Sequence, residues 1–285
     1  MKVLVAGGTG YIGAAVVERL VERGHEVVAF VRPAAGGARR VPAAAEERYG
    51  DLADASTLQA AISADIDAIV HAGHLTGEYG TDLATIAALA GSGKKVVYVS
   101  GVWVLGETDG ADEDSPARPI PLVAYRHEVE RLVLDGGGSV VRPGVVYGRG
   151  AGIPALLRVQ AAQRGTGVYV HAGGEPPTWT FVHVDDLAEL IVTAVEKGEA
   201  AVYHGVSEEA VPMTAVAEAA ARSAGVKETA EPWPLEEAAD VLGEGFAHAL
   251  SISQRVSAAR TREALGWNPA RPGVVADLAE GSYAE

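Results

Sequence analysis

Short apolar runs alternate with amphipathic stretches through the first half of the chain. Residues 3–6 form a wholly apolar run that leads into glycines, which is typical of a strand buried on both faces. Residues 11–23 have the period of an amphipathic helix, and Gly24 follows as a stop signal. Further strands are expected at 26–31, 67–71, 95–100 and 139–142, and further helices at 55–62, 81–90 and 122–134. Strands and helices alternating at this spacing predict an α/β fold built on a doubly wound parallel sheet.

The rhythm changes after about Gly144. Glycine and proline cluster at 148–154 and 173–177, and strands no longer alternate cleanly with helices. Helices are expected at 184–197, 214–224, 235–242 and 256–265. We therefore expect a core over residues 1–144 and a smaller α/β lobe over 145–285, with some segments of the lobe returning to the core. Residues 33–45, rich in alanine, glycine and arginine, are expected to form a mobile loop.

The charge balance narrows the range of partners. Among 285 residues, Lys and Arg number 23 and Asp and Glu number 38, which gives a net charge of −15. Such a surface repels nucleic acid and anionic membranes, although a locally basic cleft would still accept a small anionic ligand. The absence of cysteine excludes disulfides and thiolate chemistry. The sequence has neither a signal-peptide pattern at its start nor an apolar run of membrane-spanning length, so we expect a cytoplasmic protein.

Three glycines stand where the first strand meets the first helix. Gly7, Gly10 and Gly13 have the spacing G-x-x-G-x-x-G within GGTGYIG. A diphosphate needs backbone N–H groups at close range and the positive end of a helix, and glycines allow that approach. A purely structural strand-to-helix turn is the alternative. The position directly after a strand and at the start of a βαβ unit favours a dinucleotide site.

The end of the second predicted strand bears on which dinucleotide would bind. An acidic residue about 20 positions after the glycines would hold the ribose diol of NAD. Here Val31 occupies that place and Arg32 follows it. Because arginine pairs well with a 2′-phosphate, we prefer NADP(H) over NAD(H). Arg39 and Arg40 are expected either to assist or to be solvated loop residues.

Two more strand ends carry polar residues. Asp51 and Leu52 follow one strand, and the run His71-Ala72-Gly73-His74 follows another. Open α/β sheets bind ligands at the carboxyl ends of their strands. His74 is a candidate acid or base because histidine titrates near neutrality, and a plain loop histidine is the alternative. No carboxylate stands near these histidines in the sequence, so we expect no metal site.

At this point the chain resembles the short-chain dehydrogenase/reductase superfamily, in its extended or atypical, NAD(P)-dependent epimerase/dehydratase-like branches. The segments that carry the resemblance are GGTGYIG at 7–13, VVYVSGVWVLG at 96–106, RPGVVYG at 142–148, FVHVDDLAEL at 181–190 and residues 265–283. The resemblance implies a Rossmann-like dinucleotide-binding core, a substrate lobe and, as a further option, a homodimer formed through the helices near 81–90 and 122–134. The motifs and the resemblance together indicate these cofactor-binding residues: Gly7, Thr9, Gly10, Tyr11, Ile12, Gly13, Arg32, Asp51, Leu52, His71, Ala72, Gly73, Pro143 and Val145.

The catalytic set of that superfamily is not intact in this chain. The family uses a Ser or Thr, a Tyr, and a Lys four residues after the Tyr. In LVAYRHEVERLVL the one tyrosine is Tyr125, and Val129 stands four residues later. Aligning on residues 130–132 instead puts Leu122 in the Tyr place and Arg126 in the Lys place.

The Ser/Thr place is also altered, because it holds Gly101 with Ser100 just before it. The remaining catalytic candidates are Tyr125 and His74 as proton donors, Ser100 as a hydrogen-bond donor, and Arg126 as an anchor for a ribose hydroxyl or a substrate anion. We expect an NADP(H)-dependent oxidoreductase that acts on a small carbonyl, alcohol or sugar-like substrate. The alternative is a non-redox protein on the same scaffold, either an isomerase or cyclase or a cofactor-sensing regulator.

Overall fold

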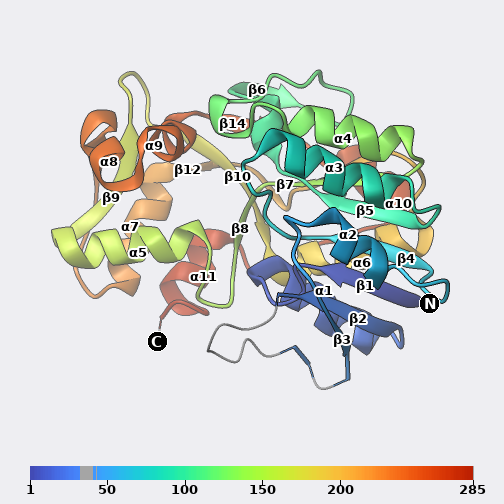
Figure 1. Ribbon diagram of the computed structural model, residues 1–285. Helices are drawn as coiled ribbons and strands as arrows, with labels where there is room; N and C mark the ends of the chain where they lie inside the picture. Colours follow the sequence, from blue (N-terminus) through green and yellow to red (C-terminus); the bar gives the residue numbers. More distant parts are fainter. Residues whose placement is uncertain (33–40, 43, 285) are drawn as a thin grey trace.

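The computed structural model describes residues 1–32, 41–42 and 44–284, and its core is a seven-stranded sheet. Figure 1 shows this core beside a smaller lobe that carries the C-terminus. All of the pairings in the large sheet are parallel. Its strands in spatial order are β11 (Val202–Gly205), β7 (Ser139–Pro143), β5 (Lys95–Val99), β4 (Ala68–His71), β1 (Lys2–Ala6), β2 (Glu26–Val31) and β3 (Glu46–Tyr49).

Helices cover both faces of this sheet. One face packs against α1 (Tyr11–Glu22) and α6 (Val184–Lys197), whose buried side chains share a cluster with Val3 and Val5. The other face packs against α2 (Ala55–Ala61), α3 (Tyr79–Ala90) and α4 (Arg126–Asp135), together with Leu4 and Ala6. Successive β1 side chains thus enter opposite layers, which explains why the strand is apolar throughout. The predicted doubly wound fold class is confirmed.

The lobe has its own apolar cluster and three small sheets. The sheets join β12 (Glu208–Pro212), β10 (Thr178–His183) and β8 (Val145–Tyr147); β13 (Lys227–Pro234) and β9 (Thr166–His171); and β14 (Gln254–Val256) and β6 (Thr108–Ala111). Its helices are α5 (Ile153–Arg164), α7 (Met213–Ser223), α8 (Leu235–Leu242), α9 (Glu244–Ser251) and α11 (Val274–Glu280). Three later elements, α6, β11 and α10 (Ala259–Leu265), return to the core (Figure 1).

Two predicted helices begin later than expected. The expected helix at 122–134 is a 3₁₀ turn, Pro121–Val123, followed by α4 from Arg126, so Tyr125 lies at the N-cap of α4. The expected helix at 256–265 starts at Ala259, because Val256 pairs with Ala111 as part of β14. Most of the expected loop at 33–45, including Arg39 and Arg40, lies outside the described residues. No helix within the described part of the chain is long and apolar enough to span a membrane.

Candidate functional site

A cavity of about 420 Å³ opens at the carboxyl ends of β1, β2, β4 and β5. Most of the residues predicted to bind a cofactor line it: Gly7, Thr9, Gly10, Tyr11, Ile12, Arg32, Asp51, Leu52, Ala72 and Gly73. The catalytic candidates His74, Ser100 and Arg126 line it as well. Sequence reasoning missed several apolar and aromatic members of the wall, among them Phe30, Leu75 and Tyr98.

The turn between β1 and α1 leaves no room for side chains. Gly7 has φ +84°, and a Cβ atom there would lie 2.6 Å from the Cα of Gly73. A Cβ atom on Gly13 would lie 2.1 Å from the carbonyl oxygen of Gly7. Glycine is therefore required at both positions, once for conformation and close approach and once for helix packing. Gly13 does not line the cavity itself, so its contribution is to bring the helix close to the turn.

The first turn of α1 presents backbone N–H groups to the cavity. The N-cap is Gly10, whose own N–H donates to the carbonyl of Gly7 at 2.9 Å. The first intrahelical bond runs from the N–H of Ala14 to the carbonyl of Gly10. The N–H groups of residues 11–13 therefore precede the hydrogen-bonded part of the helix and carry its partial positive charge. This arrangement fits a diphosphate.

Polar residues at the ends of β2 and β3 form another part of the wall. Arg32 is exposed and follows Val31 at the end of β2. Asp51 is also exposed, and its Oδ1 accepts the N–H of Ala53 at 3.0 Å. The side chain of Leu52 fills the space beside Gly73. A Cβ atom on Gly73 would lie 2.4 Å from Cδ1 of Leu52. Arg32 and Leu52 thus provide one cation and one apolar contact at the place where the adenosine end of the cofactor is expected from the sequence.

His71 lies behind the cavity wall rather than in it. It is 1% exposed, its ring packs against Tyr98 at 5.5 Å, and its Nδ1 has no hydrogen-bond partner among the described residues. Burial lowers its pKa to about 4, so the ring is neutral at neutral pH. Pro143 and Val145 also lie outside the lining of this cavity, and their contact with a nicotinamide ring stays a prediction.

Tyr125, a proton-donor candidate from the sequence, does not line the cavity and is engaged with other residues. Its hydroxyl donates to Oδ2 of Asp82 at 2.6 Å, and its ring meets Tyr79 edge-on at 5.4 Å. It is not among the described residues that line the cavity. Burial, reinforced by Asp82, raises its pKa to about 12. The physical reason is the 3₁₀ turn before α4, which makes Tyr125 a cap residue instead of a residue on the helix face.

Asp82 is the polar residue of this region that sequence reasoning missed. It is 2% exposed on α3 and accepts hydrogen bonds from the N–H and hydroxyl of Thr76, the N–H of Gly77 and the hydroxyl of Tyr125. Burial alone would raise its pKa, but these donors outweigh burial and lower it. A lone charged residue within the largely apolar DLATIAALA was the available signal.

Ser100 and Arg126 bring two unpaired polar groups to the cavity. Ser100 is 7% exposed at the end of β5, and its Oγ has no partner among the described residues. Arg126 is half-buried at the start of α4, and its Nε is likewise buried without a partner there. A Cβ atom on Gly101, the residue after Ser100, would lie 3.7 Å from Nη1 of Arg126, so the guanidinium lies within van der Waals reach of this glycine. Both groups are therefore available to a ligand.

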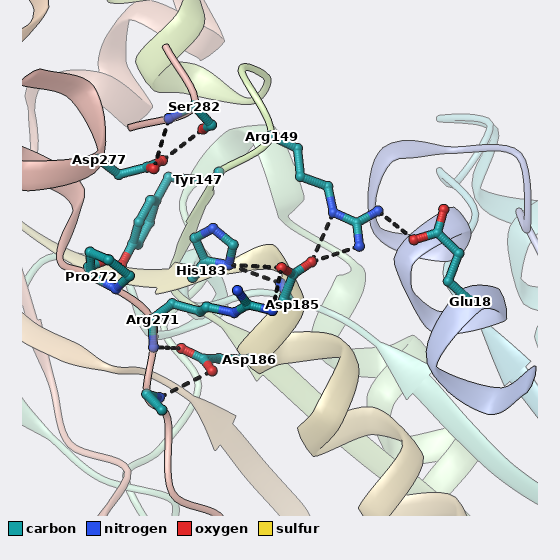
Figure 2. A network of polar contacts seen from close by, with 12 residues as sticks. Glu18, Tyr147, Arg149, His183, Asp185, Asp186, Arg271, Pro272, Asp277 and Ser282 are labelled. Carbon is teal, nitrogen blue, oxygen red and sulfur yellow. Dashed lines mark hydrogen bonds and ion pairs between the residues drawn. The ribbon is translucent and has the colours of Figure 1, made fainter. Parts of the chain in front are cut away.

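A polar network joins the core to the lobe (Figure 2). Asp185, at the start of α6, accepts Nη2 of Arg149 at 2.7 Å and Nη2 of Arg271 at 3.0 Å. Arg149 also reaches Glu18 on α1 at 2.8 Å. The Nδ1 of His183 accepts a hydrogen bond from the N–H of Asp185 and caps α6. Because an accepting Nδ1 must be unprotonated, this cap requires a neutral ring. Burial favours the neutral ring, since it lowers the pKa of His183.

The segment 148–151 ties α1 to the lobe at a second point. The hydroxyl of Tyr11 donates to the carbonyl of Gly148 at 2.8 Å. The hydroxyl of Tyr283 accepts the N–H of Gly148 at 2.7 Å and donates to the carbonyl of Ala151 at 2.6 Å. Two tyrosines far apart in the sequence therefore fix one short loop against the cavity wall.

The chain is similar to known proteins over nearly its whole length. A model of the NAD dependent epimerase/dehydratase family matches residues 3–206. An uncharacterised protein of Saccharomyces cerevisiae is 31% identical over 302 residues, which cover 98% of each chain. The 3-diazoavenalumate denitrifying reductase of a Streptomyces species is 31% identical over 308 residues, covering 95% of this chain and 97% of the relative.

Solved structures agree with this relationship. The human epimerase family protein SDR39U1, crystallised with NADPH, has 28% identity and a TM-score of 0.76, with 99% of both chains covered. The UDP-glucose 4-epimerase of Thermus thermophilus, in complex with NAD, has 22% identity and a TM-score of 0.78 and shows the shared fold. These findings, with the open helix end and the glycine turn, support a nicotinamide dinucleotide cofactor and an oxidoreductase-like role. The chain belongs to the NAD-dependent epimerase/dehydratase family.

Proposed function

We propose that this protein is an NADP(H)-dependent oxidoreductase that acts on a small carbonyl, alcohol or sugar-like compound. One observation carries the proposal: the open first turn of α1 faces a cavity that also holds the cation Arg32 and the unpaired groups of Ser100 and Arg126. A diphosphate satisfies the helix end, and a 2′-phosphate satisfies Arg32.

The residues present fit the cofactor that the family implies. The glycine turn leaves room for the diphosphate, Asp51 and Leu52 lie where the adenosine end is expected, and Arg32 supplies the charge that a 2′-phosphate needs. When bound, a nicotinamide dinucleotide supplies or accepts the hydride of the reaction. The nicotinamide end is assigned to the side of the cavity that holds Ser100.

The chain's own groups provide the remaining chemistry at the substrate oxygen. The Ser100 hydroxyl can donate a hydrogen bond to a carbonyl oxygen, and the fixed charge of Arg126 stabilises negative charge that develops nearby. Arg126 stays protonated and does not deliver the proton. Of the two proton donors expected from the sequence, His74 is the one that lines the cavity, so we assign the proton transfer to His74.

Titration with NADPH, NADH, NADP⁺ and NAD⁺ tests the cofactor assignment. We expect the phosphorylated forms to bind more tightly by about tenfold or more, as a charge-assisted pair predicts. Arg32→Ser should abolish that preference and leave the affinity for NADH unchanged, whereas Arg131→Ser, on the outer side of α4, should change neither. Absence of binding by all four nucleotides at millimolar concentration would overturn the proposal.

A second candidate function follows from the hydrogen bond between Tyr125 and Asp82. Because Leu122 stands in the usual donor place and Tyr125 donates to Asp82, a non-redox isomerase, cyclase or cofactor sensor on this scaffold is the alternative. A panel of aldehydes, ketones and sugars with NADPH separates the two. Consumption of NADPH that His74→Gln slows supports the oxidoreductase. Tight NADPH binding with no consumption across the panel supports the alternative.

The proposal includes a small-molecule substrate and a homodimer that pairs α3 and α4. Tyr79 on α3 and Leu122 in the 3₁₀ turn before α4 are exposed large side chains. Light scattering checks the dimer, and Tyr79→Glu should shift a dimer toward the monomer.

A further inference from the structure

Arg126 is a cation without an anionic partner at the cavity wall. Within the part of the chain that the structure describes, its Nε is buried with no acceptor, and no ion pair to its guanidinium is formed. A half-buried guanidinium usually has a carboxylate beside it, because desolvating an unpaired charge is costly. The question is why this one has none.

The two carboxylates near Arg126 are already committed to other groups. Glu130 lies one turn further along α4, which is the ordinary position of a salt-bridge partner. Its carboxylate is 2% exposed and receives Nη2 of Arg142 at 2.7 Å and Nε of Arg142 at 3.1 Å. Arg142 on β7 thus takes up the partner that Arg126 would otherwise have.

Asp82 is committed in the same way. Four donors from Thr76, Gly77 and Tyr125 surround its two oxygens, at distances of 2.6 to 3.1 Å. His71, the last residue of β4, is neutral and therefore adds no charge to this cluster. The protein therefore supplies two buried carboxylates in this region and directs both away from the arginine in the cavity.

We infer that the substrate carries a carboxylate group and that Arg126 binds it, while the Ser100 hydroxyl donates to the reacting oxygen beside that group. This inference rests on the proposed oxidoreductase function. A planar guanidinium pairs with the two oxygens of a carboxylate, and one unpaired cation balances one monoanion. The phosphates of the cofactor are assigned to the open end of α1 and to Arg32, so they do not compete for Arg126.

A competing role for Arg126 is to hold a ribose hydroxyl of the cofactor, as expected of the place it occupies in the family pattern. The two roles differ in what the side chain selects. A ribose anchor affects the affinity for the dinucleotide and is indifferent to the charge of the substrate. A carboxylate anchor distinguishes an acid from its ester and leaves the affinity for the dinucleotide nearly unchanged.

The test uses matched probes that differ only in this charge: phenylglyoxylate and its methyl ester, and pyruvate and its methyl ester. Calorimetric titration of the NADP⁺-loaded protein measures binding without turnover, and NADPH oxidation measures kcat/KM. For at least one of the two probes, we expect the acid to bind more tightly than its methyl ester, and to have a higher kcat/KM, by about tenfold or more. The reason is that the ester cannot form the charge-assisted hydrogen bonds with the guanidinium.

Three variants locate the effect. Arg126→Leu should equalise acid and ester, Arg126→Lys should retain part of the preference, and Arg131→Leu should retain all of it because Arg131 is an exposed residue of the same helix. Binding of NADPH to the unaltered protein reports on the proposed function alone. Binding of NADPH to each variant is measured separately and shows whether Arg126 anchors the cofactor instead. Equal binding of acid and ester by the unaltered protein would overturn the inference. So would an Arg126→Leu protein that keeps the preference and loses affinity for NADPH.

Discussion

Polar groups are paired in one region of the molecule and unpaired in another. The first region is the network around Asp185 and Asp186 that connects the core to the lobe, called the joint below, and the second is the cavity. In the joint, Asp185 receives two arginines, and Asp186 receives the N–H groups of Ala270 and Arg271 at 3.1 and 3.0 Å (Figure 2). At the cavity, Ser100 Oγ and Arg126 Nε have no partner among the described residues. Both regions are charged and partly buried, so burial alone does not distinguish them.

The difference separates two kinds of contribution. A buried donor or acceptor that is satisfied internally stabilises the fold, and its loss exposes its partner. A buried polar group that is left unsatisfied costs folding free energy, and at a cavity wall a bound ligand can supply the missing partner. Substitutions in the joint should therefore change stability without changing binding, and substitutions at the cavity should do the reverse.

The largest effect is expected at the glycine turn, where fold and binding meet. Gly13→Ala places a methyl group 2.1 Å from the carbonyl of Gly7 and should push α1 away from the turn. We expect dinucleotide affinity to fall by about a hundredfold or more, because the helix end no longer meets the diphosphate. Gly80→Ala is the matched control, since a Cβ atom on this helical glycine meets nothing within 4 Å. Equal binding by both variants would contradict the role assigned to the turn.

The buried histidine behind the cavity should make stability depend on pH. The pKa of His71 falls from 6.5 to about 4 in the folded protein, so below pH 6.5 the unfolded chain binds a proton that the folded protein does not. Its contribution is complete above pH 6.5 and is lost as the pH falls toward 4, by about 3 kcal/mol in all.

Urea unfolding at pH 7.5 and pH 4.5 checks this expectation. The loss of stability should be smaller in His71→Asn than in the unaltered protein. His74→Asn, three residues away and exposed, should lose as much as the unaltered protein. An identical loss in all three would show that His71 titrates normally.

A smaller effect is expected within the joint. Asp186→Ala leaves two backbone N–H groups near residues 270–271 without their acceptor and should lower the free energy of unfolding by about 2 kcal/mol. NADPH affinity should stay the same once the protein is folded. Thermal unfolding and NADPH titration of one preparation measure both quantities. A drop in affinity with unchanged stability would remove the distinction between the two regions.

The smallest effect on stability is expected at the cavity. Ser100→Ala removes a hydroxyl that has no partner among the described residues, so the free energy of unfolding should change by less than about 0.5 kcal/mol. Turnover of the preferred acid should fall by about tenfold, in line with the loss of one hydrogen bond to the reacting oxygen. Ser92→Ala, whose hydroxyl donates to the carbonyl of Leu89, provides a serine with a structural bond for comparison. A larger loss of stability in Ser100→Ala than in Ser92→Ala would contradict the claim that the Ser100 hydroxyl has no structural partner and is available to a ligand.

The sequence predicted features whose signals are local. Apolar runs and helical periods located the strands and helices of the core, and the glycine turn was recognisable because its three residues lie within one short stretch. The start of α4 was misplaced, because Pro121 begins a separate 3₁₀ turn that the helical period does not reveal. Hydrogen bonds such as Tyr125 to Asp82 join residues 43 positions apart, and no local pattern encodes them. The commitment of Glu130 to Arg142 was invisible for the same reason, although it decides what Arg126 is free to bind.

Tyr283 fastens one wall of the site from a distant part of the chain. The close contacts of the glycine turn join residues 7, 13 and 73. The loop that seats Tyr11 is held by a hydroxyl 135 residues beyond Gly148. A truncation that removes Tyr283 therefore keeps every residue of the diphosphate cradle and deprives the neighbouring wall of its hydrogen bonds at Gly148 and Ala151.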